Sequence, residues 1–246
     1  MKVSLFIPCT VDLMMPEIGV AVYKLLSRLG IEPVYHANQT CCGQPLFNAG
    51  YREQAKRAAK HFIEVFGEDD MIVSPSGSCV SMVKHHYPEL LSEETSWHNR
   101  ACELSFRMVE FSQFVVDILR VTGLGASFSG KVTYHESCHI FRALGISCQP
   151  RKLIAAVKGI QLVEMQNATA CCGFGGEFSV GFPEISEAIV KDKTENFINT
   201  GADLLVLNEP GCLLNINGYL HRNHPQKRAI HLASFLYENS REASHA

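Results

Sequence analysis

The sequence lacks a long apolar run, a strong excess of one charge and any C-x-x-C pair. No run approaches the roughly 20 apolar residues of a membrane-spanning helix, so we expect no membrane span. The apolar run at residues 3–8 is shorter than the roughly 7–15 residues of a signal-peptide core, and we expect a cytoplasmic protein. A formal net charge of -3 gives no reason to expect nucleic acid as a partner.

Nucleotide-binding motifs are absent as well. No G-x-G-x-x-G follows an expected strand and no P-loop sequence occurs, so neither supports a bound dinucleotide or nucleoside triphosphate. The missing C-x-x-C pair disfavours a dithiol redox site. Structural zinc usually shows closely spaced cysteine pairs of the C-x₂₋₄-C type, and these are missing too.

Cysteine is the residue type in excess. The chain has 246 residues and ten cysteines, and eight of these form one pattern that occurs twice. A single cysteine is followed by a Cys-Cys-Gly triplet and then by another single cysteine, and four thiolates match the ligand count of an iron–sulfur cluster. The eight are Cys9, Cys41, Cys42 and Cys79 in the first half, and Cys138, Cys171, Cys172 and Cys212 in the second.

The two halves look like copies of one unit. Corresponding cysteines are separated by 129 to 133 residues, and so steady an offset implies duplication of a unit of about 125 residues. The glycine- and serine-rich segment 123–130 is the best candidate for a linker. We therefore expect one cysteine-rich lobe over residues 1–125 and a second over residues 126–246.

Apolar periodicity predicts alternating strands and helices in each lobe. Such alternation is typical of an α/β fold, so we expect two pseudo-symmetric lobes, each with a mostly parallel sheet flanked by helices. The expected strands are 2–8, 31–36, 71–74, 131–135, 160–165, 203–208 and 228–232, and the expected helices are 16–29, 50–66, 103–119, 150–158, 183–199 and 212–222.

This order places every repeated cysteine just beyond the C-terminal end of a strand. Ligands of open α/β sheets bind outside those ends, so cysteines far apart in sequence should converge at one edge of each sheet. The glycine after each cysteine pair leaves room for backbone N–H groups to approach a cluster. We expect two metal sites, each made by four thiolates.

Other residues near the pattern are ambiguous. His135 and His139 flank Cys138 and are polar residues at a strand end, hydrogen-bond donors to the site, or ligands. Cys102 and Cys148 stand outside the repeat and are typical of ordinary buried cysteine. Nothing identifies a general acid or base, so we assign no catalytic residue.

The doubled motif extends over the whole chain. It comprises QTCCGQP at 39–45, SPSGSC at 74–79, CCGFGGEFS at 171–179 and GCLLNI at 211–216. This pattern resembles the cysteine-rich CCG domain family, which includes iron–sulfur subunits of heterodisulfide reductase, of glycolate oxidase and of lactate utilization. A double match is far more specific than a single Cys-Cys-Gly triplet.

The resemblance implies an iron–sulfur electron-transfer subunit of an oxidoreductase complex that oxidises L-lactate to pyruvate. Its partners would be the other subunits, including a further iron–sulfur protein. A glycolate- or heterodisulfide-linked system is an alternative, because the cluster chemistry would be the same. A zinc-stabilised scaffold without redox chemistry and a thiol-based redox sensor are alternatives of other classes.

Family members with the fullest motif carry a fifth cysteine in each half and are associated with non-cubane clusters. Here Ser76 and Glu209 occupy the places of that cysteine. Four cysteines per half make a [4Fe–4S] cluster the expected cofactor, with up to one cluster in each half.

Overall fold

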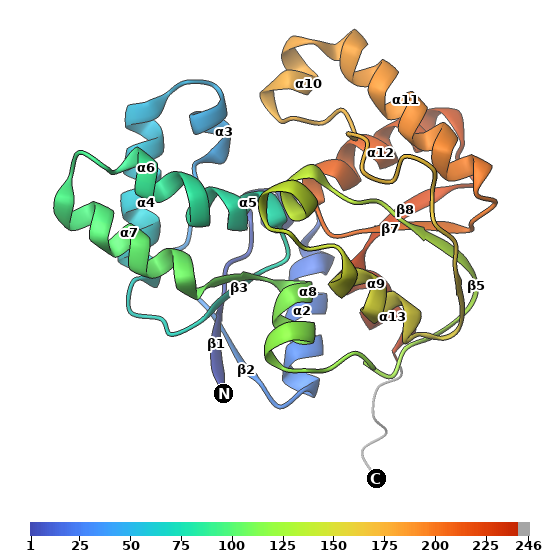
Figure 1. Cartoon of the computed structure of the whole chain (residues 1–246), viewed down its shortest axis with the longest axis horizontal. Helices are drawn as coiled ribbons and strands as arrows, with labels where there is room; N and C mark the ends of the chain where they lie inside the picture. Colours follow the sequence, from blue (N-terminus) through green and yellow to red (C-terminus); the bar gives the residue numbers. More distant parts are fainter. Residues whose placement is uncertain (241–246) are drawn as a thin grey trace. The chain divides into compact units, whose positions relative to one another are not determined.

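The computed structural model describes residues 1–240. The chain forms two compact units, the first from Met1 to Phe114 and the second starting at Val115. The lobe boundary expected between residues 125 and 126 remains a prediction. Each unit contains a four-stranded parallel sheet with helices around it (Figure 1), which confirms the predicted α/β class.

The first unit has the strand order β2-β1-β3-β4. The central strand β1 pairs in parallel with β2 on one side and with β3 on the other. The elements are β1 (Lys2–Leu5), α1 (Cys9–Met14), α2 (Pro16–Arg28), β2 (Glu32–Tyr35), α3 (Gln44–Asn48), α4 (Arg52–Phe66), β3 (Ile72–Ser74), α5 (Gly77–Ser81), the π-helical turn η1 (Met82–His86), α6 (Tyr87–Leu90), α7 (Thr95–Arg107), β4 (Met108–Glu110), α8 (Phe111–Gln113) and η2 (Phe114–Ile118), which crosses into the second unit.

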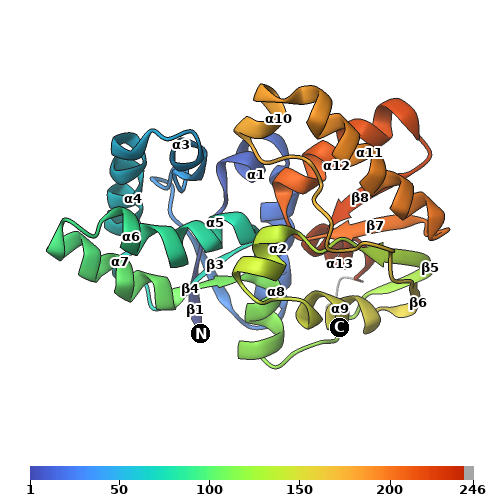
Figure 2. The same cartoon turned by 45° about the horizontal axis from the view of Figure 1, so that its top comes forward.

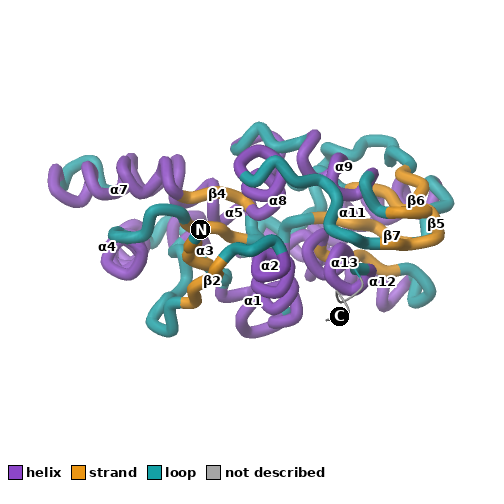
Figure 3. The backbone as a smooth tube through the Cα atoms, turned by 90° about the horizontal axis from the view of Figure 1, so that it is seen from below, coloured by secondary structure: helices purple, strands orange, loops and turns teal. Residues whose placement is uncertain are grey.

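The second unit repeats this arrangement with the order β6-β5-β7-β8. In this unit helix α11 (Pro183–Asn199) contacts both α10 (Glu177–Gly181) and α12 (Pro210–Asn223) (Figure 2). Figure 3 shows helices flanking the strands of each unit. The elements are β5 (Ser127–Tyr134), η3 (His139–Ala143), α9 (Cys148–Ala155), β6 (Lys158–Leu162), α10 (Glu177–Gly181), α11 (Pro183–Asn199), β7 (Leu204–Leu207), α12 (Pro210–Asn223), β8 (Arg228–His231) and α13 (Leu232–Asn239).

Helix α2 shows how local sequence determines an element. Pro16 occupies its first turn, where the missing backbone N–H costs nothing. The apolar positions recur at helical spacing and face the core. The buried residues of α2 are Ile18, Ala21, Val22, Leu25 and Leu26.

One predicted helix is wrong. Residues 103–119 do not form a single helix, because the strand β4 (Met108–Glu110) interrupts them. All three residues of β4 are buried and pair in parallel with β3. The Glu110 carboxylate then accepts the N–H groups of Ser112 and Gln113 and so caps a new helix. A non-local strand partner outweighs the helical periodicity of this segment.

The expected linker is also partly wrong. Segment 123–130 is not a free connection throughout, because β5 begins at Ser127 and pairs with β6.

The core of the first unit includes an aromatic cluster under its sheet edge. Phe6 is fully buried, with its ring centroid 4.8 Å from that of Phe62 and 5.8 Å from that of Phe66.

We expect Phe6→Ala to destabilise the first unit by about 3–5 kcal/mol, because it removes a buried ring and leaves a cavity. The measurement is urea unfolding of the metal-free chain followed by fluorescence of Trp97, the one tryptophan of the sequence, which lies in α7. Phe106→Ala is the matched control, because Phe106 is 81% exposed, and should change stability by about 0.5 kcal/mol or less. Equal effects of the two variants would contradict the assignment of Phe6 to the core.

Candidate functional site

The repeated cysteines of the first unit follow the strands in the predicted manner. Cys9 is the first residue of α1, just after β1, and Cys79 lies in α5, just after β3. Cys41 and Cys42 lie in the loop between β2 and α3. Because these strands are parallel, their carboxyl ends meet at the same edge of the sheet.

The four thiols of the first unit form two contacting pairs. The Sγ atoms of Cys9 and Cys41 are 3.6 Å apart, and those of Cys42 and Cys79 are 3.3 Å apart. A side-chain hydrogen bond between Cys41 and Cys42 joins the two pairs. The structure therefore gathers all four sulfur atoms into one network at the sheet edge.

The second unit gathers its cysteines at the equivalent edge. Cys138 directly precedes η3, Cys212 lies in α12, and the adjacent pair occupies the loop between β6 and α10. The Sγ atoms of Cys172 and Cys212 are 2.8 Å apart. Cys171 is hydrogen bonded to Cys172 and interacts electrostatically with Cys138.

The glycine of each Cys-Cys-Gly triplet is required by the geometry. Gly43 and Gly173 have φ angles of +82° and +81°, which favour glycine. A Cβ atom on Gly173 would lie 2.6 Å from the carbonyl oxygen of Ser186. In both loops the glycine N–H donates to the Sγ of the first cysteine, at 3.4 Å to Cys41 and 3.3 Å to Cys171. Backbone donors aimed at sulfur stabilise a thiolate.

Two hydrogen bonds that sequence reasoning missed fix the carbonyls of the triplets. The Tyr87 hydroxyl donates to the Cys42 carbonyl at 2.8 Å. The Asn215 side-chain amide donates to the Cys172 carbonyl at 2.8 Å. Asn215 belongs to the GCLLNI motif, so its place in that motif was the available signal, whereas Tyr87 had none.

Ser76 and Glu209 occupy matching places, as the motif comparison predicted. Ser76 is the N-cap of α5 and accepts the Cys79 N–H, and Glu209 is the N-cap of α12, ahead of Cys212. Both side chains are buried. Burial raises the pKa of the Cys138 thiol, and the charges of Cys171 and Glu209 raise it further.

Proton affinity differs sharply among the thiols of the first unit. Hydrogen bonds from Cys42 and then Cys9 lower the pKa of Cys41 to about 3. The hydrogen bond to Cys41, burial and neighbouring thiolates raise the pKa of Cys9 well above its usual value. Cys41 is therefore the thiol that ionises first, and the Cys9 thiol donates a hydrogen bond to it.

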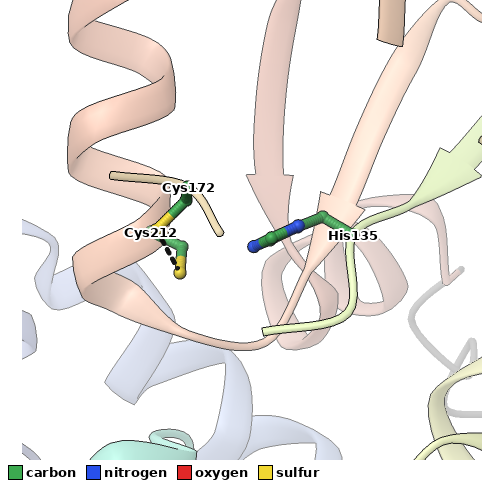
Figure 4. A group of neighbouring side chains, drawn as sticks. All are labelled: His135, Cys172 and Cys212. Atoms are coloured by element: carbon green, nitrogen blue, oxygen red, sulfur yellow. Dashed lines mark hydrogen bonds between the residues drawn. The ribbon is translucent and has the colours of Figure 1, made fainter. Parts of the chain in front are cut away.

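His135 lies next to the thiols of the second unit. It follows β5, is 1% exposed, and points toward Cys172 and Cys212 (Figure 4). Its ring and the two Sγ atoms place three possible ligand atoms within 4.8 Å of one another. His139, by contrast, lies with its Nδ1 3.7 Å from the Cys138 Sγ.

The two remaining cysteines have other surroundings. Cys102 lies in α7 with its Sγ 3.6 Å from a ring nitrogen of His98. Cys148 starts α9, is exposed, and contacts Gln149. Neither takes part in a thiol network among the described residues, and the expectation that Cys148 is buried is wrong.

The donor sets fit a thiolate-bound metal centre. Four sulfur atoms in each unit offer the ligand count of an iron–sulfur cluster, and glycine N–H groups already point at sulfur. The geometry equally provides soft sulfur ligands for other metals. Together the fold and the site define a class: a duplicated α/β protein with one cysteine-rich site in each copy.

Comparison with known proteins agrees with this class. The family model described as CCG, cysteine-rich domain, matches residues 3–84 and 132–217, one match in each unit. The chain is 44% identical over 236 residues to lactate utilization protein A of Oceanobacillus iheyensis, with 96% of each chain covered. It is 45% identical over 241 residues to lactate utilization protein A of Halalkalibacterium halodurans, with 98% of each covered.

The chain belongs to the cysteine-rich CCG domain family and, within it, to the group of lactate utilization proteins A. Among solved structures, a hypothetical protein from Helicobacter pylori has a TM-score of 0.66 at 10% identity, over 99% of this chain and 49% of that one. This likeness supports the fold alone.

We expect Cys41 of the metal-free chain to be alkylated by iodoacetamide at a rate nearly independent of pH between about 5 and 8. Its lowered pKa keeps it ionised throughout that range. Cys9, whose pKa is raised, should react about tenfold faster for each added pH unit, because only the thiolate reacts. Peptide mapping by mass spectrometry gives the two initial rates.

Cys42→Ala is the informative variant for this test, because it removes the thiol whose interaction contributes most to the lowered pKa of Cys41. Its loss should shift the pH profile of Cys41 upward. Identical profiles for Cys41 and Cys9 in the native chain would contradict the donor arrangement.

Proposed function

We propose that the chain is an iron–sulfur electron-transfer subunit, with one cluster site in each unit, that acts in the oxidation of L-lactate to pyruvate. The observation that carries the proposal is the convergence of thiols at the carboxyl edge of both sheets. The proposed ligands are Cys9, Cys41, Cys42 and Cys79 in the first unit and Cys138, Cys171, Cys172 and Cys212 in the second.

The residues of each pocket support this role. When bound, an iron–sulfur cluster supplies one-electron chemistry at a potential set by its surroundings. The N–H groups of Gly43 and Gly173 stabilise negative charge on sulfur, which raises a reduction potential. Tyr87 and Asn215 hold the loops that carry the adjacent cysteines, through hydrogen bonds to the Cys42 and Cys172 carbonyls.

Lactate enters the proposal through the relatives, whose printed names concern lactate utilization. Oxidation of lactate to pyruvate releases two electrons and two protons. One-electron carriers must take these electrons one at a time from a substrate-oxidising centre in a partner and pass them to an acceptor. We therefore propose that the partners are other subunits of the complex, including a further iron–sulfur protein.

We propose a cytoplasmic location, because cysteine clusters persist as thiolates in a reducing compartment. Within residues 1–240, none of the helices has the length and apolar character to cross a membrane.

Anaerobic reconstitution with iron and sulfide tests the cluster proposal. We expect about four irons and visible absorption for each occupied pocket, as for [4Fe–4S] clusters. Cys42→Ser and Cys172→Ser should each lose the iron of one pocket, because each removes a buried ligand. Cys148→Ser is the matched control and should keep all of it. Less than one iron per chain, or a colourless protein with stoichiometric zinc, would refute the proposal.

The substrate needs a separate test. The chain is combined with its partner subunits and supplied with lactate, glycolate or a disulfide substrate, and reduction of the clusters is followed by electron paramagnetic resonance. We expect reduction by lactate. Turnover of only glycolate or only the disulfide would assign the chain to one of those systems, with the cluster sites unchanged.

A further inference from the structure

One buried position, which directly follows the central strand of each sheet, has an apolar side chain in the first unit and a polar one in the second. Phe6 directly follows β1, and its N–H donates to the Val73 carbonyl of β3 at 3.0 Å. His135 directly follows β5, and its N–H donates to the Val206 carbonyl of β7, also at 3.0 Å. These bonds make Phe6 and His135 structural counterparts. Phe6 belongs to the aromatic core of the first unit. At the corresponding position of the second unit, His135 has a ring with two nitrogen atoms.

A second exchange accompanies the first. The buried residues of α4 and α11 match one for one, so that Phe62 of α4 corresponds to Lys193 of α11. The Cβ contacts of the triplet glycines agree, since Gly43 approaches the Ala55 carbonyl oxygen and Gly173 approaches that of Ser186. The matched sets are Ala55, Ala59, Phe62, Ile63 and Phe66 in α4, and Ser186, Val190, Lys193, Thr194 and Phe197 in α11.

The exchange replaces an apolar pair with a polar one. The rings of Phe6 and Phe62 pack edge to face in the first unit, while His135 and Lys193 interact electrostatically in the second. Lys193 is 1% exposed, and its Nζ donates to the carbonyls of Asn167 and Ala168 at 2.8 and 3.1 Å. Lys193 thus has partners for its charge in the protein itself.

The ring of His135 is poorly partnered. Neither Nδ1 nor Nε2 makes a hydrogen bond of regular geometry to a described residue. The Ala168 carbonyl lies near enough for a weak hydrogen bond with the protonated ring, but this oxygen already accepts from Lys193 and from the Glu136 N–H. Burial of a polar group without a full set of partners is unfavourable. The fold retains two such atoms, and one of them lies within 4.8 Å of the sulfur atoms of Cys172 and Cys212.

We propose that His135 supplies a nitrogen ligand to the metal centre of the second unit, beside Cys172 and Cys212. This inference rests on the proposed iron–sulfur function. Metal–sulfur and metal–nitrogen bonds of about 2.3 and 2.0 Å leave the donors of one ion roughly 4 Å apart or less. The observed separation is close to this limit, so small side-chain movements suffice.

The chemistry of the ring agrees with this role. The ring is buried, and neutral imidazole is the form that binds metal. Imidazole is a common ligand of iron, and replacement of thiolate by imidazole raises a cluster's reduction potential. The second centre then has a mixed sulfur and nitrogen ligand set, and the first has sulfur alone.

The test uses the full-length chain with the first site removed by Cys42→Ser and Cys79→Ser, reconstituted anaerobically with iron and sulfide and then reduced. Pulsed electron paramagnetic resonance is recorded with and without ¹⁵N-histidine labelling. We expect a strong nitrogen coupling that changes with the label and disappears in His135→Phe, which installs the residue of the first unit. His139→Phe is the matched control and should keep the coupling.

His135→Cys guards against misfolding, because it keeps a ligand. It should bind iron in native amount and show a more negative midpoint potential. Iron in the second site without histidine coupling, or with coupling that survives His135→Phe, would overturn the inference and leave the proposed function intact. A second site that binds no metal at all would overturn the inference as well.

Loss of iron from both sites of the native chain would instead refute the proposed function. Zinc in the second site, with a nitrogen ligand that X-ray absorption detects and His135→Phe removes, would support the ligand and reject iron.

Discussion

Parallel pairing of one central strand with two neighbours is the constraint on which both sites depend. β1 lies between β2 and β3, and β5 lies between β6 and β7, all in parallel pairing. Parallel strands end at the same edge, so segments that follow them must leave the sheet side by side. Cysteines that are tens of residues apart therefore meet without any direct link between them along the chain.

The triplet loops convert this convergence into a defined geometry. The positive φ of Gly43 and Gly173 turns each loop so that the glycine N–H faces the Sγ of the first cysteine in the triplet. Each loop is then held from outside by a different residue, Tyr87 in the first unit and Asn215 in the second. The two units share the backbone conformation of the triplet loop, but different side chains hold it in place.

Much of this was predictable because the signals are local or repeated. Pro16 at the start of α2 and the apolar runs of the strands are local signals, and the predicted elements are present. The doubled cysteine spacing is a repeated signal, and it indicated the two corresponding sites. The strand β4 was missed because its burial depends on β3, more than thirty positions earlier in the chain.

The same limit applies to the site. Spacing predicted that the cysteines converge, but it gave no information on which thiols contact one another or on the poorly partnered ring of His135. A histidine after a strand is ordinary in sequence. Its meaning depends on what packs around it, and the structural counterpart at Phe6 becomes visible only when the two folds are compared.

The ammonium group of Lys193 links the core of the second unit to its cysteine site. Burial lowers the pKa of Lys193 to about 8, whereas negative charge on Cys172, Cys212, Cys171 and Glu136 acts to raise it. Phe62 occupies the corresponding place in the first unit and carries no charge. Ionisation of the cysteines therefore changes the proton affinity of a core residue in the second unit, and the first unit has no such coupling at this position.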